Sequence, residues 1–200
     1  MPREFSPKEA EKHKRLFEEA CALVKGELHL DGHAIPGPPD FRTKLKLRRA
    51  AALFEQVLKI NPENGPATFH LARIRLRFGD KEGCLGYLLR AQALLPQSPG
   101  VARESIMVAM QLGQLDRALQ IAKDAVTRIP EDGGLFVNFG LALLTSGRAA
   151  EAEAAFRKAA DLEPANPVTP KLAAAARLVA TGATPPLRTV DEVARAIEAL

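Results

Sequence analysis

Apolar residues recur at intervals of three and four along most of this 200-residue chain, the spacing that gathers them on one face of an α-helix. From residue 65 onward these apolar runs come in pairs, and a proline closes each pair. With Pro62, which closes the helical run before residue 65, these prolines stand 34 residues apart: Pro62, Pro96, Pro130 and Pro164. A fixed period of about 20–50 residues is typical of a repeat architecture rather than of one globular core. The pattern therefore predicts an all-α repeat protein.

Glycine and proline mark the expected ends of the helices. Gly79, Gly113 and Gly147 are also 34 residues apart, and each follows the first apolar run of a pair. Glycine after a helix takes the left-handed conformation at little cost, and proline prevents the second helix from continuing. The expected helix pairs are 66–78 with 81–95, 99–112 with 115–129, and 134–146 with 149–163.

Further helices are expected on both sides of these three pairs. Ser6-Pro7-Lys8-Glu9 is a capping box with proline at the first helical position, and a second helix is expected over about 43–60. The Gly- and Pro-rich segment 26–40 lies between them and cannot be helical throughout. An alanine-rich helix follows the last pair over about 169–181, and a final helix opens at a second capping box, Thr189-Val-Asp-Glu192.

The residues at fixed positions of the unit resemble the tetratricopeptide repeat (TPR) family, whose unit is an antiparallel helix pair of about 34 residues. With Gly133 as position 1, eight signature positions carry the family's residue or an apolar stand-in: Phe136, Phe139, Gly140, Leu143, Ala152, Phe156, Ala159 and Pro164. The units that begin at Pro99 and Gly65 match less completely. In the latter, Arg75 replaces an aromatic residue at position 11, so it either reaches out along its helix or leaves a loose joint. The resemblance implies an α-solenoid, a right-handed superhelix of antiparallel helix pairs.

The first unit is split. Its second half keeps the signature residues Ala50, Phe54 and Val57, and we identify its first half as the helix around Phe17 and Ala20, displaced by the 26–40 insertion. A loop of this length is functional or disordered. We therefore divide one elongated domain into three parts: an N-terminal helix with inserted loop (1–41), a TPR array (42–164) and C-terminal capping helices (165–200).

Charge is uneven along the chain. Residues 1–100 carry 17 Lys and Arg against 12 Asp and Glu, whereas residues 101–200 carry 11 against 12. The basic half favours an acidic partner, and a solvated basic surface is the alternative interpretation. No apolar run is long enough to span a membrane, and the charged N-terminus lacks the apolar stretch of a secretory signal, so we expect a cytoplasmic protein.

The family resemblance also implies where a ligand binds. It places a concave groove along the first helix of each pair, lined by Phe69, Arg73, Leu76, Arg77, Arg103, Met107, Met110, Gln111, Val137, Asn138, Leu141, Leu144 and Lys171. This groove is basic toward its N-terminal side and apolar toward its C-terminal side, which suits a peptide or protein segment with acidic and apolar residues. The alternative is that the methionines and leucines of this set only pack inside the superhelix. A carboxylate clamp for chaperone C-termini is not expected, because only Asn138 occupies a clamp-like position.

Other chemistry finds little support in the residues. Cys21 and Cys84 fall in apolar runs and are expected to pack as small hydrophobic residues. His29, Asp31 and His33 are metal ligands by residue type but have no fourth ligand, so no metal site or cofactor is expected. His13 and His70 are expected on the surface or in the groove. No catalytic motif is present, so we expect no enzyme activity.

Basic residues recur along 42–49, at Arg42, Lys44, Lys46, Arg48 and Arg49. The run is nearly free of the aromatic residues on which bases stack, which disfavours a nucleic-acid partner.

Three functions remain in competition. The first is a scaffold or adaptor that binds a peptide or protein in the groove. The second is the N-terminal interaction region of a larger enzyme, such as a glycosyl- or sulfotransferase, since the sequence stops at Leu200 inside an expected helix. The third is a homo-oligomer that assembles through its terminal helices, with Ala173–Ala176, Leu178 and Val179 as the exposed face if the last helix leaves them uncovered.

Overall fold

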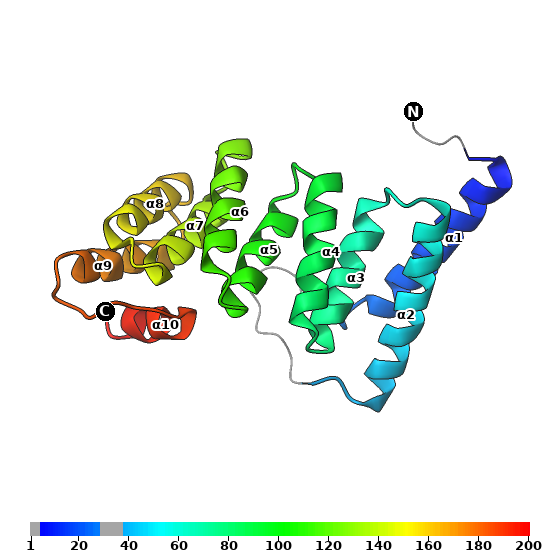
Figure 1. Ribbon diagram of the computed structural model, residues 1–200, viewed down its shortest axis with the longest axis horizontal. Coiled ribbons are helices and arrows are strands. Elements are labelled where there is room, and N and C mark those ends of the chain that lie inside the picture. The colour runs from blue at the N-terminus through cyan, green and yellow to red at the C-terminus, as the bar shows by residue number, and fades with distance from the viewer. Residues whose placement is uncertain (1–4, 29–37) are drawn as a thin grey trace. The chain divides into compact units, whose positions relative to one another are not determined.

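The computed structural model describes residues 5–28 and 38–200, and all regular secondary structure within these ranges is α-helical. The chain forms two compact units, residues 1–96 and 97–200. The helices of the first unit are α1 (Pro7–Val24), α2 (Phe41–Ile60), α3 (Gly65–Arg77) and α4 (Lys81–Leu94) (Figure 1). Those of the second are α5 (Pro99–Gln111), α6 (Leu115–Arg128), α7 (Gly133–Thr145), α8 (Ala149–Leu162), α9 (Val168–Ala180) and α10 (Val190–Glu198).

The glycine and proline punctuation explains where the helices end. Gly79, Gly113 and Gly147 have φ values of 84°, 70° and 82°, so all three take the left-handed conformation expected after a helix. Each donates its backbone N–H to a carbonyl of the helix that it ends; that of Gly79 lies 2.9 Å from the oxygen of Leu76. Every helix end of the three expected pairs falls within one residue of its expected position.

Side-chain caps explain where helices begin. The capping box at the start of α1 is present: Ser6 Oγ accepts from the N–H of Glu9 at 3.3 Å, and Glu9 Oε2 accepts from the N–H of Ser6 at 3.0 Å. α2 begins two residues before its expected start because Asp40 caps it, accepting from the N–H of Thr43 at 2.7 Å. At α10, Thr189 caps as expected. The carboxylate of Glu192, however, accepts from the N–H of Arg188, 2.6 Å away, one residue earlier than the expected box.

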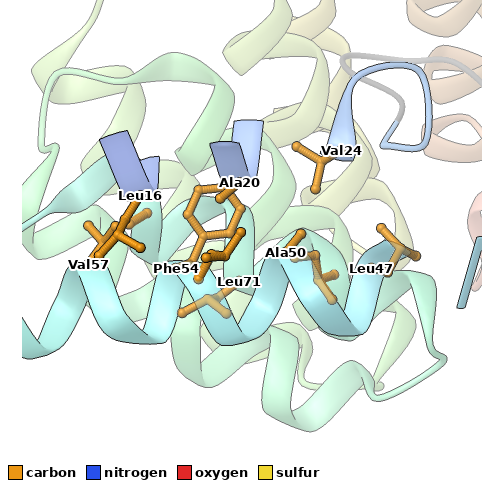
Figure 2. Packing of buried hydrophobic residues seen from close by; sticks show 11 residues of the cluster. Leu16, Ala20, Val24, Leu47, Ala50, Phe54, Val57 and Leu71 are labelled. Atoms are coloured by element: carbon orange, nitrogen blue, oxygen red, sulfur yellow. The ribbon is translucent and has the colours of Figure 1, made fainter. Parts of the chain in front are cut away.

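The first unit is held together by an apolar cluster that α1, α2 and α3 share. Figure 2 shows side chains of α1, among them Leu16 and Ala20, directed toward those of α2, among them Phe54 and Val57. Leu71 of α3 joins the same cluster. α1 therefore packs on α2 as the first half of the split pair, even though 16 residues separate the two helices in sequence.

Glu27, three residues after the end of α1, is hydrogen-bonded to α2. Glu27 accepts hydrogen bonds from Lys46 Nζ at 2.8 Å and from Thr43 Oγ1 at 3.2 Å, both on α2. The hydrogen bond from Lys46, with a smaller contribution from Thr43, holds the pKa of the Glu27 carboxyl below its usual value. The expectation for the histidines and aspartate at 29, 31 and 33 falls outside the described residues.

The ring of His70, a half-buried residue of α3, packs against aromatic side chains of α1 and α2. Its ring stacks on Phe54 with centroids 4.9 Å apart and planes 7° apart, and the ring of Phe17 lies 6.3 Å away. Cys21 Sγ lies 3.9 Å from its Nε2, and its Nδ1 is buried without a hydrogen-bond partner among the described residues. Burial, and secondarily the charge of Arg73, lowers the pKa of His70 to about 4. The folded first unit thus favours the neutral form of the half-buried His70.

In the second unit, the signature residues of the unit that begins at Gly133 form the contact between α7 and α8. A Cβ atom placed on Gly140 would lie 2.5 Å from the Phe156 ring, closer than any normal contact. Glycine is therefore needed at position 140 for α7 and α8 to pack closely. The Phe156 ring fills the space where a larger residue would have its Cβ atom, and it is fully buried.

Arg75, which replaces an aromatic residue of the repeat pattern, reaches outward along its helix. Arg75 is exposed, and its Nη1 lies 3.4 Å from Asp80 Oδ2 at the start of α4. Its guanidinium also lies 6.0 Å from the ring centroid of Tyr87. The guanidinium thus stays at the surface while the rest of α3 packs, as expected for a long charged side chain.

Neither Cys21 nor Cys84 is part of a disulfide. Cys84 is buried in α4, and Cys21 is half-buried in α1, where desolvation and the nearby Glu18 raise the pKa of its thiol. A raised thiol pKa lowers the fraction of reactive thiolate, which agrees with a packing role.

Candidate protein-binding surface

The first unit carries four of the predicted groove residues on α3. Asn64 caps this helix by accepting from the N–H of Ala67 at 2.8 Å, and Pro66 lies in its first turn. Phe69 and Arg73 are four residues apart and therefore lie on one face. The Arg73 guanidinium lies 4.2 Å from the Phe69 ring centroid, which is a close cation–π contact. Arg73 is only 6% exposed, and the other two predicted residues, Leu76 and Arg77, are half-buried.

The cap of α3 is itself bonded to α1. Asn64 Nδ2 lies 3.0 Å from His13 Nε2, and the ring of His13 stacks on Phe5 with centroids 6.1 Å apart. Sequence reasoning missed this link, because the only local signal was a cap residue at the start of α3. The link places α3 relative to α1 within the first unit.

In the second unit, α5 carries a strongly held arginine. Arg103 Nη1 lies 3.2 Å from Oδ1 and 3.3 Å from Oδ2 of Asp132. Asp132 also caps α7, because its Oδ1 accepts from the N–H of Leu135 at 2.8 Å. A Cβ atom on Gly134 would lie 2.7 Å from Arg103 Nη1, so glycine leaves room for the guanidinium. The direction of the Arg103 side chain is therefore set by the start of α7.

The remaining predicted residues of α5 and α7 differ in how far they reach the surface. Gln111 is exposed, and Met107 and Val137 are half-buried. The others are buried: Met110, Asn138 and Leu141 are each 9% exposed, and Leu144 is 1% exposed. This burial favours the alternative that Met110, Leu141 and Leu144 only pack inside the superhelix. Of the predicted residues in this paragraph, Met107, Gln111 and Val137 remain within reach of a ligand.

The last predicted residue, Lys171 of α9, is exposed and in contact with α10. Its Nζ lies 3.5 Å from the backbone oxygen of Ile197. α10 packs on α9, and Figure 1 shows α9 between α8 and α10. On α9, Ala175 and Ala176 are buried, whereas Ala174 is exposed and Ala173, Leu178 and Val179 are half-buried. The sequence predicted capping helices over 165–200 and left open whether the last one covers this face; the structure shows α10 packed on α9.

Two surface hollows of the second unit are lined by residues outside the predicted set. A hollow of about 340 Å³ between α7 and α8 is lined by Phe136, Phe139, Leu143, Glu151, Ala154, Ala155 and Lys158. A second, of about 270 Å³, lies between α8 and α9. The predicted set is thus a row of side chains along helices rather than the lining of a pocket, which fits a macromolecular ligand better than a small molecule.

Two other kinds of site are absent from residues 5–28 and 38–200. No group of three or more His, Cys, Asp or Glu side chains is arranged to hold a metal ion in this part of the chain. Within the same ranges, no helix combines the length and the apolar character that crossing a membrane requires.

The basic run at the start of α2 is partly paired. Lys46 forms its ion pair with Glu27, and Arg49 forms one with Glu19 of α1. Phe41 precedes the run and is 81% exposed, so one aromatic ring accompanies these cations. Proteins that bind single-stranded nucleic acid stack successive bases on several aromatic rings, so the run still disfavours such a partner.

Comparisons with known proteins agree with this architecture. The tetratricopeptide repeat family model matches residues 46–104, and a second model of the same description matches residues 105–167. The curated "Small glutamine-rich tetratricopeptide repeat-containing protein 2" of Mycosarcoma maydis is 35% identical over 88 residues. That match covers 44% of this chain and spans only 25% of the length of the relative.

Solved structures show the same fold at low sequence identity. A crystal structure of the MamA protein has a TM-score of 0.68 and 15% identity, covering 94% of this chain and 90% of that one. A tetratricopeptide repeat protein from Parabacteroides merdae has a TM-score of 0.69 and 16% identity, covering 93% of this chain and 64% of that one. The two family matches together run over more than half of the sequence. The chain therefore belongs to the tetratricopeptide repeat family.

Proposed function

We propose that this chain is a protein-interaction scaffold that binds a peptide or protein segment along the first helices of its repeats. In the first unit the binding residues are the half-buried side chains of α3, namely Phe69, Leu76 and Arg77, and the buried Arg73 supports the Phe69 ring. In the second they are the reachable residues Arg103, Met107, Gln111 and Val137, with Lys171 on α9. The proposal includes no catalytic step and no cofactor.

The observation that carries the proposal is the Arg73–Phe69 pair on α3. Arg73 is itself 6% exposed, so the pair presents the half-buried Phe69 ring, which the guanidinium 4.2 Å away holds in place and which therefore loses little conformational freedom when a ligand binds. Arginine and aromatic residues are also the types most often found at the energetic centres of protein interfaces. Arg103, held by Asp132, is a second oriented cation, within the second unit.

The chemistry of these residues indicates the chemistry of the partner. Oriented arginines favour carboxylates, and Met107 adapts its shape to irregular apolar groups. We therefore propose a partner segment with both acidic and apolar side chains. We place the interaction in the cytoplasm, since Cys21 and Cys84 form no disulfide, as is usual in a reducing compartment. Self-assembly through the terminal helices is not part of the proposal, because α10 already covers part of α9.

Site-directed photo-crosslinking tests the surface. A benzoyl-phenylalanine residue replaces Gln111, which is exposed on the first helix α5, and the protein is irradiated in native cell extract. The matched control carries the same residue in place of Gln120, which is exposed on the second helix α6. We expect a protein adduct from position 111 and none of the same mass from position 120. Adducts of the same mass from both positions, or from neither, would contradict the proposal.

Charge reversal tests the chemistry of the partner. Arg77→Glu is expected to lower recovery of the captured protein, because it replaces a cation of the α3 face by a carboxylate. Lys59→Glu makes the same charge change on the exposed side of α2 and is expected to leave recovery unchanged. Arg73 is a poorer choice for reversal, since a carboxylate would be buried there. Equal recovery with both variants would refute an acidic partner on α3.

A further inference from the structure

α10 lies over one end of the surface to which the proposed function assigns binding. It packs on α9, and Figure 1 shows it on the side of α9 that faces away from α8. The contact between Lys171 Nζ and the oxygen of Ile197 joins α10 to a predicted ligand-binding residue. A segment of the chain itself therefore covers the place where a partner would contact α9.

One face of α10 holds it in place. Val190, Val193 and Ile197 are spaced three and four residues apart, which puts them on the same side of the helix. Val193 is 1% exposed, and its two companions are half-buried. Arg195 and Glu198 are exposed to solvent. α10 is thus an amphipathic helix bound by its apolar side, as a peptide ligand binds a groove.

The attachment of α10 is light compared with that of the other helices. It has nine residues, and an isolated helix of that length is marginal in water, so it is helical because it is docked. The preceding linker contains Gly182, with φ of 75°, and two prolines at 185 and 186 that have no N–H to donate. The Lys171 contact, at 3.5 Å, is at the long limit of a hydrogen bond. α9 keeps its own packing on α8 when α10 leaves.

We propose that α10 is a displaceable stand-in for a partner helix, and that the partner binds α9 by taking its place. This proposal rests on the proposed function and specifies the partner. The partner segment is an amphipathic helix with apolar residues in the spacing of Val190, Val193 and Ile197. It carries net negative charge, as α10 does with three carboxylates, at 191, 192 and 198, against the single cation Arg195.

If a partner helix must displace α10, its affinity for α9 depends on the fraction of molecules in which α10 is undocked. A tethered helix competes at an effective concentration in the millimolar range, so a free helix binds weakly until the tethered one is released. The apparent dissociation constant rises by the inverse of the undocked fraction. Releasing α10 by mutation must therefore tighten binding of a free helix.

A synthetic peptide of residues 187–200 with an N-terminal fluorescein is the probe, and fluorescence anisotropy measures its binding to the full 200-residue chain. Val193→Asp puts a carboxylate at the buried position and undocks α10. We expect the peptide to bind this variant at least about tenfold more tightly than the wild type. Ala194→Asp, at an exposed position of the same helix, adds the same charge and is expected to bind as the wild type does. A peptide that itself carries Val193→Asp is expected to bind none of the proteins.

Equal affinity of wild type and Val193→Asp for the peptide would overturn the proposal, as would a folded Val193→Asp variant that does not bind it. α10 would then be a permanent cap. Hydrogen exchange on the wild type gives a test without any mutation: amides of 190–198 should exchange faster than those of 168–180, and equal protection would refute displacement. The peptide assay uses only this chain, whereas the crosslinking assay uses a cellular partner, so each can fail while the other succeeds.

Discussion

The burial of His70 predicts that the first unit loses stability in mild acid. The imidazole has a pKa of about 4 in the folded chain, against about 6.5 when it is exposed in the unfolded chain. Between these values the unfolded chain binds more protons, so the free energy of unfolding falls as the pH drops below about 6.5. The loss is complete below about pH 4. Because one pKa unit corresponds to about 1.4 kcal/mol, it amounts to about 3 kcal/mol in all and to about 2 kcal/mol by pH 5.

Tyr87 supplies a local assay for this effect. It is the only tyrosine, the chain has no tryptophan, and Tyr87 packs against the apolar cluster of the first unit. Urea unfolding followed by tyrosine fluorescence at pH 7.5 and pH 5 therefore reports on the unit that contains His70. His70→Phe keeps a ring on Phe54 but has no group to protonate.

The test compares how much unfolding free energy the wild type and His70→Phe each lose between pH 7.5 and pH 5. The wild type should lose about 2 kcal/mol more than His70→Phe between pH 7.5 and pH 5, because carboxylates and other titrating groups are the same in both. An equal loss in the two proteins would show that His70 is protonated in the folded chain and would refute the assignment of a neutral imidazole.

Two further predictions concern packing and helix capping. Gly140→Ala should destabilise the second unit by about 1–3 kcal/mol in urea unfolding followed by circular dichroism, because the added methyl group meets the Phe156 ring. Gly86→Ala, with open space around its Cβ in α4, should instead stabilise by up to about 1 kcal/mol, and a loss at both sites would contradict the steric argument. Asp132→Asn keeps a capping oxygen but removes the charge that holds Arg103, whereas Asp132→Ala removes both. Alanine should therefore cost about 1 kcal/mol more than asparagine, and equal costs would show that the cap contributes little.

Helix ends and caps could be predicted from the sequence because they depend on residues next to one another. The left-handed turn at Gly79 needs only a residue that tolerates positive φ, and the box at Ser6 and Glu9 needs only two side chains in one turn. The pairing of α1 with α2 was also predictable, because the apolar residues of the split repeat survive on both sides of the insertion.

The candidate surface was only partly predictable. Repeat positions placed thirteen residues on first helices, but they did not distinguish Gln111, which is exposed, from Leu144, which is buried. The burial of His70 and Arg73 was likewise missed. A three-and-four spacing says which residues share a face of a helix, and it says nothing about which neighbouring helix covers that face.

The sequence by itself determined the succession of helix pairs, since a 34-residue period of glycine, proline and small residues is local information repeated along the chain. Tertiary structure decided which side chains remain available to a partner. It buried Arg73 against Phe69, held Arg103 on Asp132 and laid α10 on α9. The physical reason is that burial depends on contacts between residues far apart in sequence. α10 illustrates this: its own sequence predicts an amphipathic helix, but only its docking shows what the apolar face binds.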